Sequence, residues 1–186
     1  MCSSWSRRHF IHTGLLTAGI VSFSPGLGVP TKDAQPDGGT EPSGGKGRDI
    51  SDWQAKIALA LQHEHGAIIQ YTNHCGKLKT RGLMDQAMTI QAIIHDEIRH
   101  AQDMIHILAD SGLEPTLAVW PPKTSQKAEV MLRQDIAAEQ GAIDLYTEIL
   151  KTDLPAVARE RVRRALAQEI EHKDLFDNLI EKIQQP

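Results

Sequence analysis

The sequence feature that most constrains the fold is a glutamate near the middle of each of four long amphipathic stretches. From residue 50 onward, apolar residues recur at alternating steps of three and four, the spacing that places side chains on one face of an α-helix. In each stretch, one position of the apolar face is a glutamate: Glu64, Glu97, Glu139 or Glu169. A buried carboxylate is costly unless a partner compensates its charge. The pattern therefore predicts four helices whose buried faces meet around compensating groups.

The apolar faces can be written out from this spacing. They are Ile57, Leu61, Glu64, Ile68, Tyr71, Cys75 and Leu78; then Leu83, Ala87, Ile90, Ile94, Glu97, Ala101, Met104 and Leu108; then Leu132, Ile136, Glu139, Ile143, Tyr146 and Leu150; then Val162, Leu166, Glu169, Phe176, Ile180 and Ile183. Helix-boundary residues agree with these faces. Ser51 or Asp49 can cap the first helix, residues 76–82 are expected to contain a turn, Gly112 ends the second helix and Pro155 opens the fourth.

Two of the four glutamates belong to a Glu-x-x-His pair, Glu97 with His100 and Glu169 with His172. A spacing of three residues places both side chains of a pair on the same helix face. Each of the four glutamates lies about 14 or 15 residues from a predicted helix end, so a rise of roughly 1.5 Å per residue brings them all to mid-height. Four carboxylates and two imidazoles at one level of a helical bundle form the ligand set of a dinuclear metal site.

The predicted metal ligands are Glu64, Glu97, His100, Glu139, Glu169 and His172. This oxygen-rich set suits iron or manganese better than zinc. The structural alternative is four buried acids with other counter-charges, for which Lys173 and Arg99 are near enough in sequence to be considered. The common height and inward direction of the six residues favour the metal site.

Other residues near the predicted centre are assigned structural roles or left open. Tyr71 lies two turns after Glu64 on the same face, and is either a hydrogen-bond partner or electron donor of the centre or an ordinary core tyrosine. Cys75 is interpreted as a small buried residue. The remaining histidines are assigned to solvent, helix contacts or interfaces, namely His63, His65, His74, His95 and His106.

The connection between the second and third predicted helices is long enough to change the topology. Residues 111–125 can span roughly 45 Å if extended, and each helix is roughly 42 Å long. We therefore predict an all-α four-helix bundle with a long crossover between the second and third helices, which makes these two helices parallel. A compact loop is the alternative that the sequence leaves open.

The N-terminal region predicts export. Residues 1–29 combine Arg7 and Arg8, followed by Phe10, with a short apolar run, which resembles a twin-arginine signal peptide. We expect the translocase of that pathway as a partner and a periplasmic or otherwise exported protein, tethered to the membrane if the signal is not cleaved. Residues 30–49 are rich in Pro, Gly and Ser and predict a flexible linker before the bundle of residues 50–186. The net charge of −4 gives no electrostatic support for nucleic-acid binding.

The chain resembles the ferritin-like superfamily, and within it the bacterioferritins most closely. The resemblance covers residues 50–186 and is carried by HEHGAIIQY, DEIRHAQDMIHIL, LRQDIAAEQGA and EIEHKDLFDNLI. It implies one metal on Glu64 and His100, a second on Glu139 and His172, and Glu97 and Glu169 bridging the two. It also implies that two Fe(II) ions bind there and are oxidised by dioxygen or hydrogen peroxide, with Glu97, Glu169 and Tyr71 as the expected catalytic residues.

Two positions depart from the bacterioferritin pattern. Bacterioferritins carry a haem-ligating methionine directly after the glutamate of the second helix, where this chain has Ile98, so we do not expect haem. Only fourteen residues follow His172, which leaves no room for the short fifth helix that helps to close the family's cage. A homodimer or a larger homo-oligomer is therefore expected without assuming a storage cage.

These observations lead to one main hypothesis and two alternatives. The main hypothesis is an exported, non-haem, ferritin-like di-iron protein that oxidises Fe(II) to Fe(III) in iron detoxification or storage. The first alternative is another di-metal redox enzyme, either similar to a manganese catalase or an oxidase. The second is a metal-binding helical module without catalytic turnover.

Overall fold

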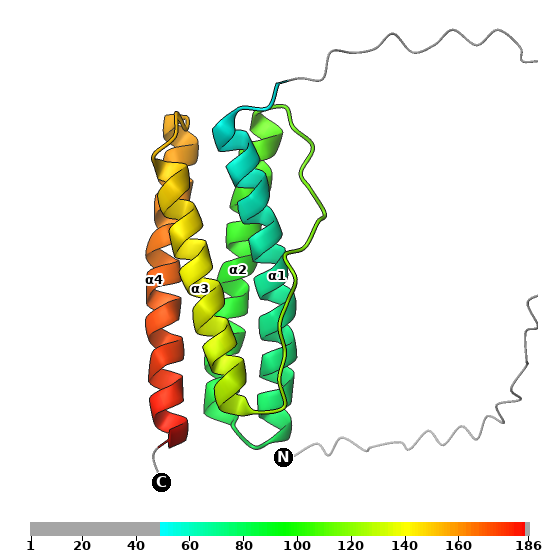
Figure 1. Ribbon diagram of the computed structural model, residues 1–186, viewed down its shortest axis with the longest axis vertical. Coiled ribbons are helices and arrows are strands. Elements are labelled where there is room, and N and C mark those ends of the chain that lie inside the picture. Colours follow the sequence, from blue (N-terminus) through cyan, green and yellow to red (C-terminus); the bar gives the residue numbers. More distant parts are fainter. Residues whose placement is uncertain (1–48, 185–186) are drawn as a thin grey trace, which may run out of the picture. The chain divides into compact units, whose positions relative to one another are not determined.

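The computed structural model describes residues 49–184, and four α-helices contain most of them (Figure 1). They are α1 (Asp52–Thr80), α2 (Met84–Asp110), α3 (Ala128–Leu150) and α4 (Ala156–Gln184). Residues 49–184 contain no strand, so the predicted all-α fold is confirmed. The predicted signal peptide and linker lie outside the described residues apart from Asp49, and they stay predictions.

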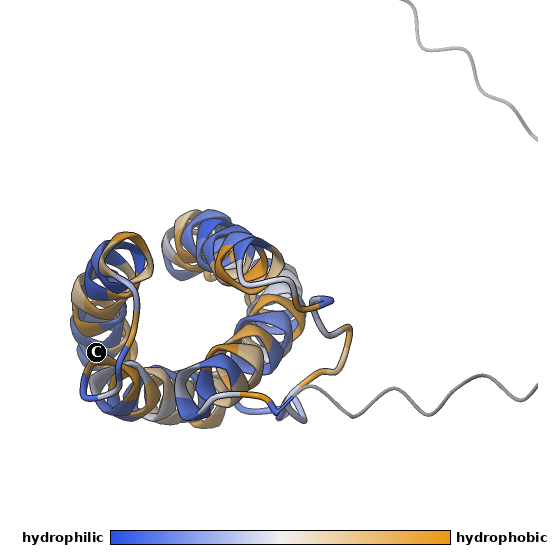
Figure 2. Ribbon diagram, turned by 90° about the horizontal axis from the view of Figure 1, so that it is seen from above, coloured by the Kyte–Doolittle hydropathy of each residue, from blue (hydrophilic) through white to orange (hydrophobic). Residues whose placement is uncertain are grey.

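The helices pack as two antiparallel hairpins, α1 with α2 and α3 with α4 (Figure 1). α1 also packs against α3, and α2 against α4. Residues 111–127 run along the bundle from the end of α2 to the start of α3, so these two helices are parallel, as the predicted long crossover requires. The view along the bundle shows the helices around a common interior, with the crossover on the outside (Figure 2).

The crossover is attached to α1 by hydrogen bonds along its path. The backbone N–H of Trp120 donates to the carbonyl oxygen of Gln62 at 2.8 Å. Further along, the Thr124 hydroxyl donates to the side-chain oxygen of Asn73 at 2.8 Å. The ammonium group of Lys77 donates to the carbonyl oxygen of Ser125 at 3.2 Å. These bonds satisfy polar groups of an irregular segment, which would otherwise have to rely on water.

A glycine in α1 permits the close approach of the crossover. A Cβ atom added at Gly66 would lie 2.6 Å from the carbonyl oxygen of Trp120, which is closer than non-bonded atoms can approach. Glycine in the middle of a helix costs about 1 kcal/mol relative to alanine. At this position the missing side chain provides the space that the backbone of the crossover occupies.

Glycines with positive φ end the first two helices. Gly82 has φ 76° and Gly112 has φ 77°, which is a conformation that few other residues adopt without strain. In each case the N–H of the next residue bonds back to a carbonyl oxygen five positions earlier, from Leu83 to Leu78 and from Leu113 to Leu108. The turn between α1 and α2 is shorter than the expected range of 76–82, because Gly76 still lies within α1.

The hydrophobic core consists of two clusters. The first contains Ile57, Ala60, Leu61, Ala101, Met104, Ile107, Leu108, Ala142, Tyr146, Ile149, Leu154, Ala158, Val162 and Ala165. The second contains Ala67, Tyr71, Cys75, Leu78, Ala87, Ile90, Ile93, Met131, Leu132, Phe176, Leu179 and Ile180. In sequence, the buried glutamates of all four helices fall between the two clusters, so a polar layer divides the core.

The buried faces differ from the predicted ones by single positions in places. Ile149 and Ala165 are buried, whereas the predicted Leu150 and Leu166 are partly buried.

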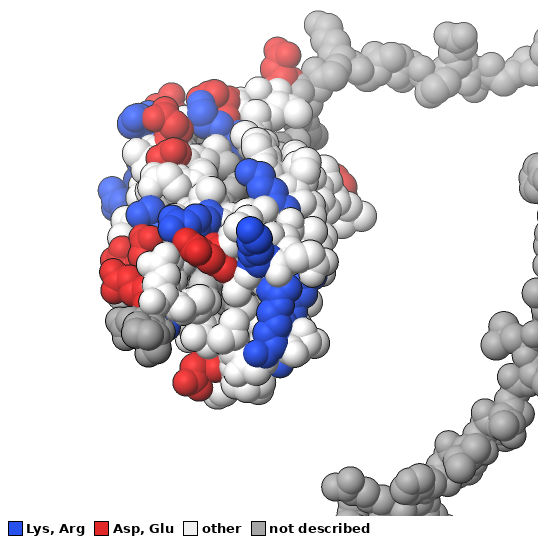
Figure 3. Space-filling view, turned by 60° about the horizontal axis from the view of Figure 1, so that its bottom comes forward, with Lys and Arg blue, Asp and Glu red and all other residues white. Residues whose placement is uncertain are grey.

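Basic and acidic side chains are both exposed on the face of the molecule that Figure 3 shows. Among the described residues, no helix combines the length and the hydrophobicity that a membrane span requires.

We expect opposite effects on stability from alanine at two glycines of α1. Gly66→Ala should lower the free energy of unfolding by about 1–3 kcal/mol, because the new methyl group collides with Trp120. Gly76→Ala should raise it by about 0.5–1 kcal/mol, because nothing lies within 4 Å of the added Cβ and alanine favours the helix. Urea unfolding followed by circular dichroism measures both, and stabilisation by Gly66→Ala would contradict the close contact.

Candidate metal centre

Six polar side chains gather in the polar layer of the bundle. α1 and α3 contribute one glutamate each, and α2 and α4 contribute one Glu-x-x-His pair each. The six are Glu64, Glu97, His100, Glu139, Glu169 and His172, and each is at most 3% exposed. The structure therefore brings together all six residues that the sequence predicted as ligands.

The six side chains form two overlapping groups with metal-ligand spacing. One group contains Glu64, Glu97, His100 and Glu169, and the other contains Glu97, Glu139, Glu169 and His172. Within each group, one ligand atom from every residue lies within 4.8 Å of the others. Glu97 and Glu169 belong to both groups, so each of them is placed to contact two ions at once.

Both histidines direct Nδ1 into the centre. The Nδ1 atom of His100 lies 2.8 Å from Oε1 of Glu169 and 3.3 Å from Oε2 of Glu97. The Nδ1 atom of His172 lies 3.0 Å from Oε1 of Glu97 and 3.6 Å from Oε2 of Glu169. The two rings lie 5.8 Å apart between centroids. Each imidazole therefore presents one nitrogen to the shared carboxylates.

The other nitrogen of each histidine contacts an oxygen outside the centre. Nε2 of His100 lies 3.2 Å from the amide oxygen of Gln168, and Nε2 of His172 lies 3.4 Å from a carboxylate oxygen of Asp96. An oxygen acceptor requires the proton to be on Nε2, which leaves the lone pair of a neutral imidazole on Nδ1. This arrangement is the one a metal-binding histidine needs.

Two tyrosines hold the glutamates of α1 and α3 by crossed hydrogen bonds. The hydroxyl of Tyr71 on α1 donates to Oε1 of Glu139 on α3 at 2.7 Å. The hydroxyl of Tyr146 on α3 donates to Oε1 of Glu64 on α1 at 2.5 Å. Burial and the nearby carboxylates raise the pKa of both tyrosines well above the usual value, so both hydroxyls keep their protons.

Tyr71 is thus a hydrogen-bond partner of the predicted centre, which was one of the two roles left open by the sequence. The matching role of Tyr146 was missed. It lies seven residues after Glu139, as Tyr71 lies seven residues after Glu64, so the repeated spacing was the available signal.

The carboxyl groups of α1 and α3 are hard to ionise without added cations. Burial raises the pKa of Glu64 and Glu139 well above the usual value, and the charges of Glu97 and Glu169 raise it further. The effect follows from the low polarizability of the surroundings and the repulsion between like charges. In the metal-free protein these two side chains favour the protonated form.

The two histidines of the centre, in contrast, favour their charged form, because their pKa values are raised. Burial opposes their positive charge, but the close carboxylates of Glu169 and Glu97 outweigh it and raise the pKa of His100 to about 11 and that of His172 to about 9. Burial also opposes ionisation of Glu169, but the nearby imidazoles of His100 and His172 hold its pKa below the usual value. Protons on the imidazoles therefore compensate the shared carboxylates when no metal is bound.

The residues fit a pair of divalent metal ions. Four carboxylates carry a charge of −4 when ionised, which two divalent ions balance. Three buried atoms of the centre, Oε1 of Glu97, Oε1 of Glu169 and Nδ1 of His172, have no hydrogen-bond partner of suitable geometry. Buried polar atoms are rarely left without partners, and bound ions are one way to provide them.

The structural alternative, in which lysine or arginine neutralises the buried acids, does not agree with the side-chain positions. Arg99 is 61% exposed and pairs with Asp96. Lys173 is 30% exposed and pairs with Asp177 at 3.5 Å. Both cations are directed to partners outside the centre.

A second buried polar cluster lies between α1 and α3. Oδ1 of Asp135 accepts a hydrogen bond from the Gln70 amide at 2.9 Å and lies 2.8 Å from Nδ1 of His74. All three side chains are buried, so the prediction that His74 lies at the surface or at an interface is wrong. It was wrong because His74 lies beside the predicted apolar stripe, and its partner Asp135 comes from a distant helix.

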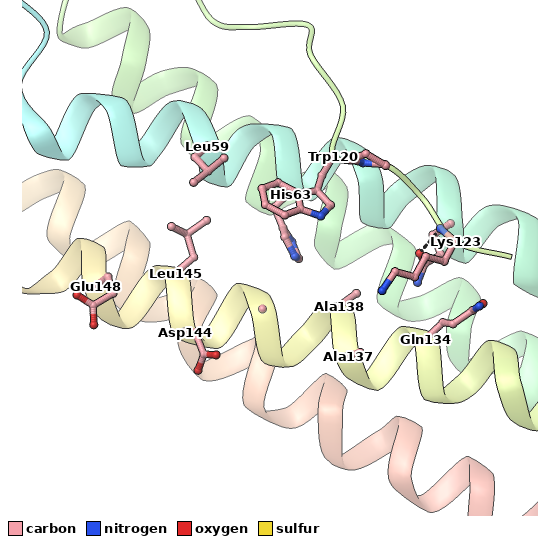
Figure 4. A pocket seen from close by; sticks show the side chains of 13 residues that line it. Leu59, His63, Trp120, Lys123, Gln134, Ala137, Ala138, Asp144, Leu145 and Glu148 are labelled. Carbon is pink, nitrogen blue, oxygen red and sulfur yellow. Dashed lines mark hydrogen bonds between the residues drawn. The ribbon is translucent and has the colours of Figure 1, made fainter.

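A cavity of about 450 Å³ lies between α1, α3 and the crossover (Figure 4). His63 and Trp120 line it together with apolar residues such as Leu145, and the two rings lie 6.0 Å apart between centroids. His63 of α1 contacts α3: its Nε2 lies 3.2 Å from the point where a Cβ atom would lie if Gly141 had a side chain. His65 Nδ1 lies 3.0 Å from the carbonyl oxygen of Ala118 in the crossover.

Three further side chains agree with their predicted surroundings. His95 and His106 are exposed. Cys75 is 5% exposed, belongs to the second apolar cluster, and donates its thiol proton to the carbonyl oxygen of Ala87 at 3.3 Å.

Comparison with known proteins gives one family and several similar structures. A model of the ferritin-like domain family matches residues 54–185. A dodecameric thioferritin from Bacteroides fragilis, described as bacterioferritin-related, has a TM-score of 0.66 and 20% identity over 73% of this chain and 88% of its own. No curated protein matches this chain.

Two bacterioferritins are also similar in structure. The protein BfrA of Mycobacterium tuberculosis has a TM-score of 0.66 and 21% identity, covering 71% of this chain and 86% of its own. The protein of Rhodobacter capsulatus, described with a metal-free dinuclear site and haem iron, has a TM-score of 0.65 and 22% identity, covering 69% and 83%. At these identities the likeness shows the fold.

We expect the metal-free protein to lose stability as the pH rises from 7 to 9. His172 keeps its proton in the folded chain up to about pH 9, and His100 up to about pH 11, whereas an unfolded histidine loses it near 6.5. The stabilisation is complete below pH 6.5 and is lost as the pH rises through the folded-state pKa, at up to roughly 1.4 kcal/mol per proton and pH unit.

Urea unfolding of chelator-treated protein at pH 7, 8 and 9 measures this loss. Replacing both histidines by glutamine should flatten the pH dependence, whereas His106→Ala, at an exposed position, should keep it. A free energy of unfolding that is constant or rises over this range in the unchanged protein would contradict the proposed charge balance.

Proposed function

This chain belongs to the ferritin-like family, and we propose that it binds two iron ions in the polar layer of its bundle and oxidises Fe(II) to Fe(III). The observation that carries this proposal is the presence of Glu97 and Glu169 in both ligand groups. Two ions that share two carboxylates are held next to each other, where one oxidant can take an electron from each. The oxygen-rich ligand set supports iron, because hard ligands favour the more highly charged ion.

The redox chemistry comes from the iron. Two bound Fe(II) ions would supply two electrons, which with two protons would reduce dioxygen to hydrogen peroxide, or hydrogen peroxide to two molecules of water. The protein would supply the metal ligands, the groups that accept protons, and a site from which bulk water is excluded.

Each side chain of the centre has a distinct task in this proposal. Glu64 with His100 and Glu139 with His172 would hold one ion each, and the shared carboxylates would hold both. Tyr146 and Tyr71 keep the glutamates of α1 and α3 oriented by their hydrogen bonds. Tyr71 remains the proposed electron donor: it would give one electron to dioxygen or hydrogen peroxide in place of one from Fe(II), and its hydroxyl proton to Glu139.

The apolar clusters on either side of the polar layer restrict water around the centre. In such surroundings the interaction between carboxylates and metal ions is stronger than in bulk water. The same surroundings raise the cost of leaving the carboxylates ionised without ions, as the raised pKa of Glu64 and Glu139 indicates. Binding of the ions therefore requires release of protons from the site.

We expect the loss of either shared carboxylate to remove rapid iron oxidation. Glu97→Ala and Glu169→Ala should lower the rate of Fe(III) formation by at least about 100-fold, because neither variant can hold the two ions together. Anaerobic protein is loaded with two Fe(II) per chain, mixed with dioxygen or hydrogen peroxide, and followed by ultraviolet absorbance. Glu171→Ala is the matched control, because this carboxylate lies on the same helix as Glu169 and is exposed.

The same experiment separates the alternatives. Unchanged rates in either shared-carboxylate variant would exclude this assignment. Stoichiometric iron binding without oxygen consumption would indicate a metal-binding module, and activity that needs manganese and peroxide would indicate a catalase-like enzyme. Metal content measured together with the mass in solution distinguishes iron storage from detoxification. Because the Bacteroides relative is dodecameric, we propose a homo-oligomer here as well; a large shell supports storage, and a monomer or dimer supports detoxification or another oxidation.

We further propose that the protein is exported through the twin-arginine pathway. The support is the order of Arg7, Arg8 and Phe10 before an apolar run. Replacing both arginines by lysine should keep the protein in the cytoplasmic fraction of a bacterial host, because the pathway reads the arginine pair. Fractionation followed by immunoblotting tests this, and unchanged export of the lysine variant would contradict it.

A further inference from the structure

The centre has two halves, one with Glu64 and His100 and one with Glu139 and His172. They differ in the residue that contacts Nε2 of the histidine. In both halves, Nε2 contacts the residue that directly precedes the glutamate of the opposite Glu-x-x-His pair. His100 contacts the amide oxygen of Gln168 at 3.2 Å, and His172 contacts a carboxylate oxygen of Asp96 at 3.4 Å. One acceptor is neutral and the other is an anion.

This difference changes the strength of each histidine as a ligand. When Nδ1 donates its lone pair to a metal ion, positive charge develops on the ring and on the N–H at Nε2. A carboxylate that accepts this N–H stabilises the charge more than an amide does. Removing such a supporting group typically lowers metal affinity by about 10–100-fold.

Asp96 presents a different carboxylate oxygen to each of its two partners. Its Oδ1 pairs with Arg99 on the next turn of α2, while its Oδ2 is directed at His172. Arg99 is 61% exposed, so water screens its charge and it compensates the carboxylate only in part. Gln168 can offer His100 only the dipole of its amide.

On the basis of the proposed metal pair, we propose that the Glu139 and His172 position holds a divalent ion more tightly than the Glu64 and His100 position does, because Asp96 supports only His172. Asp96 and Gln168 are then positioning residues that set the affinity of each half without touching the metal. As the concentration of free metal falls, the Glu64 and His100 position loses its ion first.

The test uses Co(II) and the metal-free full chain under anaerobic conditions. Co(II) absorbs visible light when bound, so absorbance and calorimetry report occupancy without any catalytic assay. We expect two Co(II) per chain, bound in two steps whose dissociation constants differ by about tenfold or more. His172→Ala should remove the tighter step and His100→Ala the weaker one, which assigns the steps to the two halves.

A pair of reciprocal substitutions tests the cause of the difference. Asp96→Asn keeps an oxygen acceptor for His172 but removes the charge, and should weaken the tighter step by about tenfold or more. Gln168→Glu adds the charge behind His100 and should tighten the weaker step. Arg99→Gln is the control for the lost ion pair: it leaves the Asp96 carboxylate in place and should leave the tighter step intact.

The outcomes separate this inference from the function on which it rests. Equal dissociation constants in the unchanged chain, or a tighter step that Asp96→Asn leaves unaltered, would overturn the inequality while the di-metal proposal stands. No binding of Co(II) at all would overturn both. Circular dichroism checks the helical content of each variant, and Gln168→Glu tests the inference from the other half if Asp96→Asn does not fold.

Discussion

Compensation of buried negative charge at mid-height of the bundle is the constraint on which the rest of the structure depends. Every helix places one carboxylate there, between two apolar clusters that keep water away. In such a layer a carboxylate must be protonated, paired or bound to a cation. The layer meets this requirement in two ways: with protons on its glutamates and histidines, or with the metal ions that we propose. The same six side chains would serve both states.

The crossover is the part of the fold that makes this layer symmetric. Because residues 111–127 return along the full length of the bundle, α2 and α3 are parallel, and α1 lies beside α3 in the opposite direction. A tyrosine two turns after the glutamate of one helix then reaches the glutamate of the other, so Tyr71 and Tyr146 make equivalent bonds on opposite sides of the layer. Gly66 contributes by giving the returning chain a place against α1.

The helices and the six side chains of the candidate centre could be predicted because a helix fixes the direction of each side chain relative to its neighbours in sequence. Contacts between distant elements could not be predicted in this way. His74 was placed at the surface or at an interface because the buried face of a bundle helix is wider than one stripe, and its partner Asp135 is on another helix. The packing of Trp120 over His63 depends on the path of an irregular segment, which has no periodicity to read. Tyr146 is different, since its spacing from the glutamate before it was visible in the sequence and was not used.

The crossed tyrosine bonds have a consequence for how the chain folds. Each hairpin carries a buried glutamate whose hydrogen-bond donor is in the other hairpin, and a Glu-x-x-His pair whose imidazole contacts the shared carboxylate across the bundle. A hairpin folded by itself would expose its apolar face and leave its carboxylate without a donor. We therefore expect that neither hairpin, α1–α2 or α3–α4, folds as an independent unit. We expect the two halves to form and to unfold cooperatively, with the polar layer as the element that couples them.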